Sequence, residues 1–471
     1  MATRRDQLQS YQFMTQRVIS AFVTRETDPQ QSPLRRGIGA LFGGLMVAVL
    51  VAAGVGIYGL LTKVGGESWR KPGSVVVEKE NGATYVYLDG RLHPTLNYTS
   101  ALLAVGRPGA PVARVSSATL AGVPRGVPMG IPNAPDSLPG VQEQAGLPWS
   151  VCSLSNPDGS GQAATRVTLA LSVTPSAATG IGDGGLLVKD AALGMEYLVW
   201  HGRRHLVQEP RVLVPALFGA VTPAPVGTSW LNALPAGVDL AALPITNREK
   251  RSDAVPGRRN GDLLVAQTGS GPQHYLVLAD GVAPITPVQQ VVLSGRFGHQ
   301  PIEVPVSEVT SLPTSEQLPQ AASNGQAPAT PPHLVTVDRG QQICAVTRES
   351  GSPPELTVGG AVPGAERATP TGSVSPDGIP LADQILAPAG RVTVLKALGS
   401  PGSYSIVTDL GIRYPVPSAA ALALLGYPAE AALDVPPSLI LLIPTGPSLD
   451  PRAATMPATA AAAAGAAGTG S

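Results

Sequence analysis

The stretch Ile38–Leu61 (IGALFGGLMVAVLVAAGVGIYGLL) decides how the rest of this chain is organised. It holds no charged residue and is as long as the ~20 residues that a helix needs to cross a bilayer. A cleavable signal peptide is the alternative, but its apolar run would cover roughly 7–15 residues and end at a small-x-small site. This run starts later, is longer, and is followed by Lys63, Arg70 and Lys71. We therefore predict a permanent transmembrane helix over 38–61.

Positive charge is concentrated before this span. Six arginines precede it, and Arg35 and Arg36 abut it, whereas the nearer C-terminal flank offers three positive residues. The positive-inside rule then keeps the N-terminus in the cytoplasm. We expect a single-pass protein of the inner (plasma) membrane with the bulk of its chain outside the cytoplasm.

The segment 1–37 has the spacing of an amphipathic helix. Thr3 stands three positions before Asp6, which resembles a capping box. We interpret the helix as a docking surface for a cytoplasmic partner; the alternative is a juxtamembrane helix that lies on lipid headgroups. Its apolar face recurs every three or four residues and consists of Leu8, Tyr11, Met14, Val18 and Phe22.

Small residues recur inside the span. Gly39 and Gly43 form a GxxxG pattern, which allows close helix–helix approach in lipid. Glycine is also common in membrane helices that stay alone, so both alternatives are open. We single out Gly39 and Gly43 as the candidate packing face.

Composition limits the function classes. The net charge is zero, which gives no electrostatic case for nucleic-acid binding. Glycine and proline (54 and 48 of 471 residues) stay below the ~25–30% typical of disorder and predict many turns. Aromatic residues are few, so we expect an aliphatic core.

Four segments share one pattern: 74–126, 186–237, 262–315 and 392–446. Each opens with an apolar strand, turns into a strand led by tyrosine, reaches a turn glycine, and continues as an amphipathic stretch that closes on a second glycine. A glycine just after a helix suits a C-cap. We predict strand–turn–strand–helix–strand in each unit, because the closing glycines precede the closing prolines by 18, 16, 18 and 18 positions: Gly106 and Pro124, Gly219 and Pro235, Gly295 and Pro313, Gly426 and Pro444.

The segments between these units also correspond. Residues 127–185 and 316–391 each hold one cysteine, and Cys344 follows Cys152 by 192 positions. We predict a tandem duplication in which both inserts pair into one central β-rich domain on a pseudo-twofold axis. The fold class is thus one transmembrane helix plus an α+β exterior with four repeat units around that domain.

The two cysteines would meet near such an axis. In an oxidising compartment a Cys152–Cys344 disulfide is the expected outcome. Two buried free thiols or a metal pair remain the alternatives. The remaining stretches are predicted as a linker over 62–73, a charged linker over 238–261 that joins the halves, and a disordered tail over 447–471. We interpret the charged linker as a solvated connector, with a contact patch as the alternative.

Catalytic patterns are missing from the sequence. It contains no G-x-x-x-x-G-K-[ST], G-x-S-x-G or H-E-x-x-H. His201 and His205 have metal-like spacing, but Gly202 marks a turn between them, and Asn97 begins a glycosylation sequon by pattern only. A scattered carboxylate pair for sugar hydrolysis stays open, although nothing favours it. We expect no catalytic residue, cofactor or metal site.

Several runs resemble the EccB family, the single-span core component of mycobacterial and actinobacterial type VII (ESX) secretion systems. They are the opening Arg4–Met14, Arg35–Arg36 before one span, Tyr87–Asn97, Trp230–Pro235 and the two cysteines. The resemblance implies a membrane complex with EccC (the motor ATPase), EccD and EccE, and a periplasmic part that self-associates. ATP hydrolysis has been proposed for the family, and its repeat units are likened to a phage-lysin wall-binding fold.

These observations favour a non-enzymatic structural core subunit of a secretion channel, oligomerising in the periplasm and docking cytoplasmic and membrane partners. A periplasmic anchor that binds cell-wall peptidoglycan is the alternative from another class. An ATPase is the third hypothesis, and the sequence offers no nucleotide motif for it.

Overall fold

The computed structural model describes residues 3–25, 34–62, 67–157, 163–318, 325–400 and 402–458. Contacts divide the chain into two compact units. One unit is Met1–Arg70 with Val115–Ala121, and the other is Lys71–Arg114 with Gly122–Ser471.

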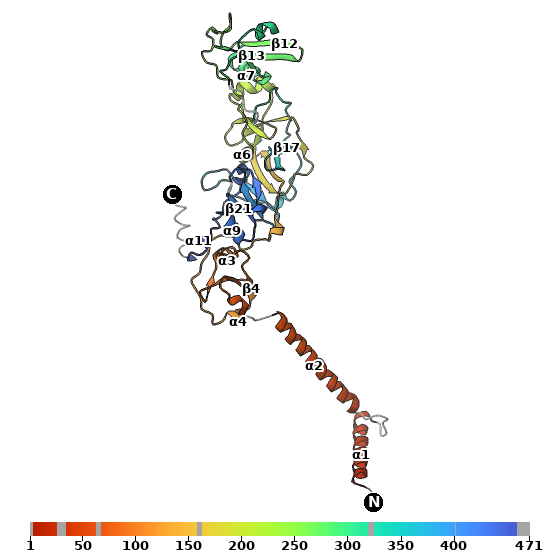
Figure 1. The fold of residues 1–471 in the computed structure, drawn as a ribbon. Helices are drawn as coiled ribbons and strands as arrows, with labels where there is room; N and C mark the ends of the chain where they lie inside the picture. Colours follow the sequence, from red (N-terminus) through yellow and green to blue (C-terminus); the bar gives the residue numbers. More distant parts are fainter. Residues whose placement is uncertain are drawn as a thin grey trace. The chain divides into compact units, whose positions relative to one another are not determined.

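The first unit is built on two helices, α1 (Arg4–Thr24) and α2 (Leu34–Thr62). The side chains of Thr3 and Asp6 form the capping box that opens α1. Figure 1 shows α2 as one uninterrupted helix. Among the described helices it alone is long and apolar enough to cross a bilayer, through Gly37–Tyr58. The short helices of this unit are η1 (Glu67–Arg70) and α4 (Ser117–Leu120).

Four small sheets in the second unit have the same strand order: third, second, first, fourth. We call them modules 1 to 4, after residues 74–126, 186–237, 262–315 and 392–446. Module 1 contains β1 (Ser74–Glu78), β2 (Thr84–Leu88), β3 (Arg91–Pro94), α3 (Tyr98–Val105) and β4 (Val112–Val115). Module 2 contains β8 (Gly185–Asp190), β9 (Glu196–Trp200), β10 (Arg203–Leu206), α5 (Pro210–Phe218), β11 (Ala224–Val226) and α6 (Thr228–Ala233).

Modules 3 and 4 repeat this order, and in modules 2 to 4 the fourth strand lies parallel to the first. Module 3 contains β12 (Leu263–Thr268), β13 (Gly271–Leu278), β14 (Gly281–Ile285), α7 (Pro287–Phe297), β15 (Ile302–Glu303) and α8 (Val306–Thr310). Module 4 contains β20 (Thr393–Ala397), β21 (Tyr404–Val407), β22 (Arg413–Val416), α9 (Ala419–Leu424), η4 (Ala429–Ala431), β23 (Leu433–Val435) and α10 (Pro437–Ile440).

The modules differ from the expected pattern in two respects. A third strand follows the turn glycine before the helix begins, so the amphipathic stretch is part strand and part helix. In module 3 the helix runs past Gly295 and ends at Gly298, whose φ is +70°. Gly295 serves packing instead, because a Cβ there would lie 3.1 Å from the Cβ of Ala216 on α5.

The two inserts form one seven-stranded sheet in the order β18-β19-β6-β5-β16-β17-β7. The central strands β5 and β16 are antiparallel, and Cys152 stands directly opposite Cys344. The strands are β5 (Trp149–Pro157), β6 (Ala163–Leu171), β7 (Thr179–Gly180), β16 (Gln342–Thr347), β17 (Glu355–Val358), β18 (Thr369–Pro370) and β19 (Gln384–Leu386), with short helices η2 (Val141–Glu143) and η3 (Ala365–Arg367).

Three aliphatic clusters join the modules to this sheet and to each other. The largest surrounds the buried rings of Trp149 and Trp230 and unites the central sheet with modules 2 and 4. A second cluster unites modules 1 and 4, and a third unites modules 2 and 3. Small modules bury little apolar surface alone, which explains why they share cores.

The charged linker over 238–261 and the first part of the tail predicted as disordered are both folded. In the segment expected as a charged linker, Asn260 is only 2% exposed and donates to the carbonyl of Asn247, while Arg258 pairs with Glu308 of module 3 at 3.0 Å. These contacts hold the segment on module 3, although most of its charged side chains stay exposed. Residues 447–458 are likewise not disordered, because α11 (Pro451–Ala454) packs against α3 of module 1. Residues 459–471 lie outside the described chain.

Candidate functional site

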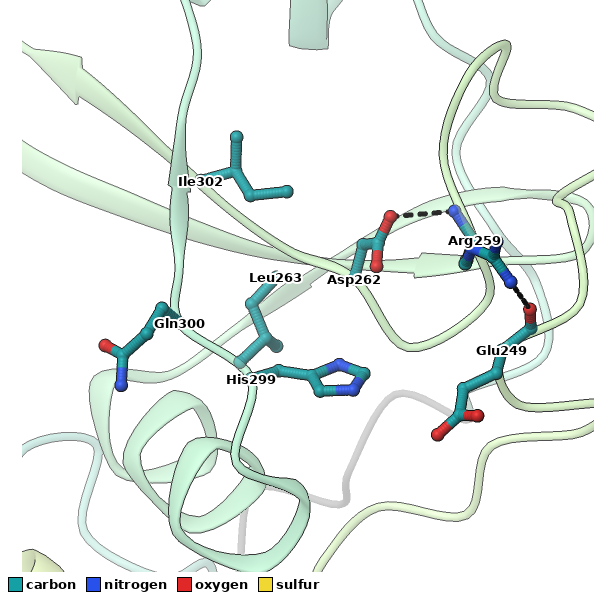
Figure 2. A pocket seen from close by; sticks show the side chains of 7 residues that line it. All are labelled: Glu249, Arg259, Asp262, Leu263, His299, Gln300 and Ile302. Atoms are coloured by element: carbon teal, nitrogen blue, oxygen red, sulfur yellow. Dashed lines mark hydrogen bonds between the residues drawn. The ribbon is translucent and has the colours of Figure 1, made fainter.

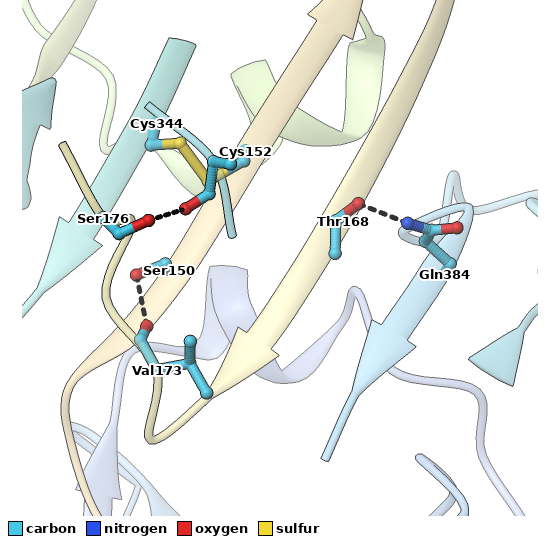
Figure 3. The surroundings of a disulfide bond; sticks show 8 residues. Ser150, Cys152, Thr168, Val173, Ser176, Cys344 and Gln384 are labelled. Carbon is cyan, nitrogen blue, oxygen red and sulfur yellow. Dashed lines mark hydrogen bonds between the residues drawn. A yellow bond between two sulfur atoms is a disulfide. The ribbon is translucent and has the colours of Figure 1, made fainter. Parts of the chain in front are cut away.

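The centre of the seven-stranded sheet is a disulfide. The sulfur atoms of Cys152 and Cys344 are 2.10 Å apart, and both residues are buried. Figure 3 shows hydrogen bonds around them that fasten the neighbouring strands. Ser150 donates to the carbonyl of Val173 at 2.7 Å, and Gln384 of β19 donates to Thr168 of β6 at 2.8 Å. The bond thus ties the first insert to the second at the middle of their shared sheet.

The five residues of the expected apolar face of α1 are exposed within their unit, whereas Ile19 beside them is half-buried. Phe22 is 87% and Tyr11 76% exposed, although water-exposed aromatic rings of this size are unfavourable. Phe13, which the periodicity did not include, is 58% exposed and lies under the guanidinium of Arg17. The expected face remains a candidate docking surface: Leu8, Tyr11, Met14, Val18 and Phe22.

Gly39 and Gly43 lie on an open surface of α2. A Cβ at Gly39 or Gly43 would meet no described atom within 4 Å. Large side chains such as Leu41 and Phe42 are also exposed around them. A second helix could therefore approach this face closely, which is the geometry that GxxxG packing requires.

The two histidines with metal-like spacing do different things. His201 occupies the β9–β10 turn, stacks on Trp200 and places Nε2 3.0 Å from Asp183 Oδ1. His205 is fully buried, with Nδ1 2.7 Å from the carbonyl of Val238. Burial lowers the pKa of the His205 imidazole. Within the described part of the chain, no three metal-ligating side chains come together.

Asn97 is also occupied structurally. It is only 6% exposed, its side chain caps α3 by accepting from Ser100, and its amide donates to the carbonyl of Ile131. The sequon pattern therefore marks a helix N-cap rather than an accessible glycosylation site.

Module 3 carries an open cleft of about 400 Å³, shown in Figure 2. Its polar groups are largely tied to each other: the Arg259 backbone donates to Asp262 Oδ2 at 2.7 Å, and the Arg259 guanidinium donates to the carbonyl of Glu249 at 2.9 Å. Sequence reasoning did not find this cleft, since it forms where the charged segment folds back. It is lined by Glu249, Arg259, Asp262, Leu263, His299, Gln300 and Ile302.

In three of the modules an aromatic side chain of the third strand packs on a glycine in the loop after the closing proline. Sequence reasoning did not predict this contact. A Cβ on that glycine would lie 2.2–2.6 Å from ring atoms. The available signal was the glycine two positions after three of the four closing prolines, Pro124, Pro235 and Pro444. The pairs are His93 over Gly126, His205 over Gly237 and Tyr414 over Gly446, whereas module 3 exchanges both partners for Ala283 and Ser315.

Together, the sheets and α2 define an α+β protein with one apolar helix near its N-terminus. The family model described as "Type VII secretion system ESX-1, transport TM domain B" (EccB) matches residues 1–463. The chain belongs to this family, which confirms the resemblance inferred from its sequence.

Relatives and solved structures are similar to this chain over most of its length. The ESX-3 secretion system ATPase EccB3 of Mycobacterium tuberculosis is 28% identical over 482 residues, covering 94% of this chain and 88% of the relative. A chain of an intact ESX-5 inner membrane complex matches with a TM-score of 0.63 and 25% identity, covering 97% and 95% of the two chains. An EccB3 dimer from the ESX-3 core complex also gives a TM-score of 0.63 with 25% identity, over 81% and 100%.

Proposed function

We propose that this chain is a non-enzymatic structural core subunit of an ESX-type inner membrane complex. The observation that carries the proposal is the likeness to a chain of the intact ESX-5 inner membrane complex over 97% of this chain. The proposed partners are EccC-, EccD- and EccE-like subunits and further copies of the chain itself. Self-association through the large unit is supported by the dimer formed by the related EccB3.

In the proposed topology, α2 spans the inner membrane, α1 lies in the cytoplasm and the four modules lie in the periplasm. The arginines before the span and the length of Gly37–Tyr58 support this arrangement. The exposed face of α1 would then meet a cytoplasmic subunit, and the Gly39–Gly43 face would meet a neighbouring membrane helix.

A tandem duplication with a pseudo-twofold axis through the disulfide is the arrangement we infer for the large unit. Because β16 and β5 are antiparallel, the residues on either side of the cysteine pair also stand opposite each other: Ile343 faces Ser153, and Ala345 faces Val151. Residues of β5 have their predicted equivalents 192 positions later on β16, as Cys152 has Cys344. A twofold axis through the cysteine pair therefore exchanges the two strands and preserves their register. Helix contacts agree, because α5 meets α7 as α3 meets α9.

Residues at equivalent positions add a chemical argument for the duplication. Four bridges place one third-strand residue of each module beside the loop after the closing proline. That residue is Leu92 in module 1 and Val282 in module 3, but Arg204 in module 2 and Arg413 in module 4. Module 1 therefore resembles module 3 at this position, and module 2 resembles module 4, as expected if modules 1 and 2 were duplicated together to give modules 3 and 4.

No hydrolytic role forms part of this proposal, although the related EccB3 is named an ATPase. The sequence has no phosphate cradle with its lysine, and the module 3 cleft has its arginine bonded to Glu249 and Asp262. Phosphate release that stays with the chain through full purification would contradict this part of the proposal.

Blue-native electrophoresis with mass spectrometry of the tagged chain, extracted from its host in mild detergent, tests the proposal. We expect it to migrate with a motor ATPase in a complex far above its own mass. Tyr11→Asp should remove cytoplasmic partners from that complex, whereas Gln12→Asp on the polar face of α1 should not. A lone monomer or small homo-oligomer in several detergents would refute the subunit role and favour the wall-binding anchor.

A further inference from the structure

One end of module 1 carries three cations. Gly73 donates to the carbonyl of Tyr87, which places Lys71 beside the β2–β3 turn. Arg91 begins β3 at that same turn. Arg107 directly follows the glycine that caps α3, and Val105 of that helix lies 3.4 Å from where a Cβ of Gly73 would be. We call this cluster, Lys71 with Arg91 and Arg107, the Lys71 end of module 1.

The other modules provide an internal control, because strand register defines the equivalent positions. Module 1 alone has a permanent cation at all three of them. The residues equivalent to Lys71, Arg91 and Arg107 are Asp183, Arg203 and Ala220 in module 2, Arg259, Gly281 and His299 in module 3, and Gly390, Ile412 and Tyr427 in module 4.

The three cations are exposed, and none forms an ion pair or ring contact with any residue that the structure describes. Among the carboxylates of module 1 that the structure describes, Asp89 lies in the β2–β3 turn, while Glu78 and Glu80 lie at the opposite turn of the sheet. In module 3 the equivalent Arg259 is hydrogen-bonded within its cleft instead. The Lys71 end is therefore a free cationic surface with a net positive charge.

The position of module 1 in the chain suggests what meets this surface. Lys71 follows the end of α2 at Thr62 by nine residues, which reach at most about 30 Å even when fully extended. Modules 2 to 4 have no such short connection to the apolar helix. An anionic surface that accompanies α2 is a lipid bilayer, whose headgroup phosphates attract lysine and arginine.

We propose that the Lys71 end of module 1 binds anionic lipid headgroups of the membrane that α2 spans. The inference rests on the proposed membrane span. Contact with headgroups would hold module 1 against the bilayer and restrict how the modules after it can turn. Each cation adds about a fivefold preference for an anionic over a neutral surface, and added salt weakens it.

Trace acetylation of the full chain in nanodiscs tests this contact. Discs are made from phosphatidylcholine alone or with phosphatidylglycerol, and labelling of Lys71 and Lys79 is measured by mass spectrometry. Lys79 is the matched control, because it is exposed at the opposite end of the same strand. We expect Lys71 to react about fivefold more slowly in anionic discs, with Lys79 unchanged. The double variant Arg91→Glu with Arg107→Glu should remove this protection, and Lys79→Glu should keep it.

Equal labelling of Lys71 in both lipids would overturn the inference, whether the rate is high or low, since charge would then play no part. Protection by inorganic phosphate in detergent alone would show a general anion site and overturn the assignment to lipid. A chain that is retained in discs but unprotected contradicts the headgroup contact only. A chain that leaves the discs contradicts the membrane span, and the inference falls with it.

Discussion

Removal of the disulfide should destabilise the central sheet strongly, because the bond closes a long loop between the two inserts. The double variant Cys152→Ala with Cys344→Ala opens a loop of 192 residues. The chain-entropy relation for a loop of that length gives about 5 kcal/mol of lost stabilisation at 25 °C. Both cysteines are buried, so the substitution also removes two sulfur atoms from the packing of β5 against β16.

Tryptophan fluorescence during thermal unfolding measures this loss. Trp149 and Trp230 are fully buried and belong to the cluster that unites the central sheet with modules 2 and 4. A cooperative unit of about 150–250 residues loses roughly 2–4 °C in Tm for each kcal/mol. We therefore expect the melting transition of the full chain in detergent to fall by about 10–20 °C.

The matched control is Ser176→Ala, which removes a hydrogen bond of 3.2 Å to the carbonyl of Ala361 beside the disulfide. Because Ser176 is exposed, this change should cost at most about 1 kcal/mol. Reductant should lower the Tm of the natural chain and leave the double variant unaffected. A double variant that melts within about 2 °C of the natural chain would refute the reasoning, since packing alone would then hold the two inserts together.

Three further changes test the modules. Burial lowers the pKa of His205, so only the unfolded chain takes up its proton just below pH 6.5; Tm should fall from there until pH passes the folded pKa, and His205→Asn should flatten this slope. Gly237→Ala should cost about 1–3 kcal/mol in chemical denaturation, because its Cβ would overlap the His205 ring, whereas Gly146→Ala in open space should be neutral. A chain ending at Gly446 should be cleaved faster in limited proteolysis, since it lacks buried contacts to module 1, and one ending at Ala458 should not.

Several strands expected from the sequence coincide with strands of the structure, because their signals are local. The first strands around Val75 and Leu263, and the tyrosine-led strands after them, lie in β1, β2, β12 and β13. A turn glycine bounds each pair, and backbone conformation at such a glycine depends on near neighbours only. The apolar run of α2 is equally local, since its length alone meets the requirement of a bilayer.

Contacts between distant segments could not be read in this way. Gly295 looked like a helix end, yet its lack of a side chain serves the contact with Ala216 on another module. The charged segment over 238–261 looked like a linker, but its Arg258 pairs with Glu308, which lies 50 positions later on module 3. The residues after Pro451 looked featureless, although Ala454 is fully buried. In each case the deciding partner lies far along the chain, where periodicity and composition carry no information.

The way in which the modules share hydrophobic cores explains why the Lys71 end of module 1 and the cleft of module 3 differ in their charged residues. Modules 2 and 4 both pack on the central sheet, and each also shares a core with one further module. Modules 1 and 3 contact one neighbouring module each through those clusters, so more of their surface is left for other partners. In the duplication that we propose, equivalent modules keep a similar residue at the bridge to the loop, with Arg204 and Arg413 in modules 2 and 4 and Leu92 and Val282 in modules 1 and 3. Modules 1 and 3 are then free to differ at the ends that no shared core covers. Modules 1 and 3 do differ at these ends: Lys71 of module 1 has no ion pair with a described residue, whereas the equivalent Arg259 of module 3 is hydrogen-bonded to the carbonyl of Glu249 in the cleft.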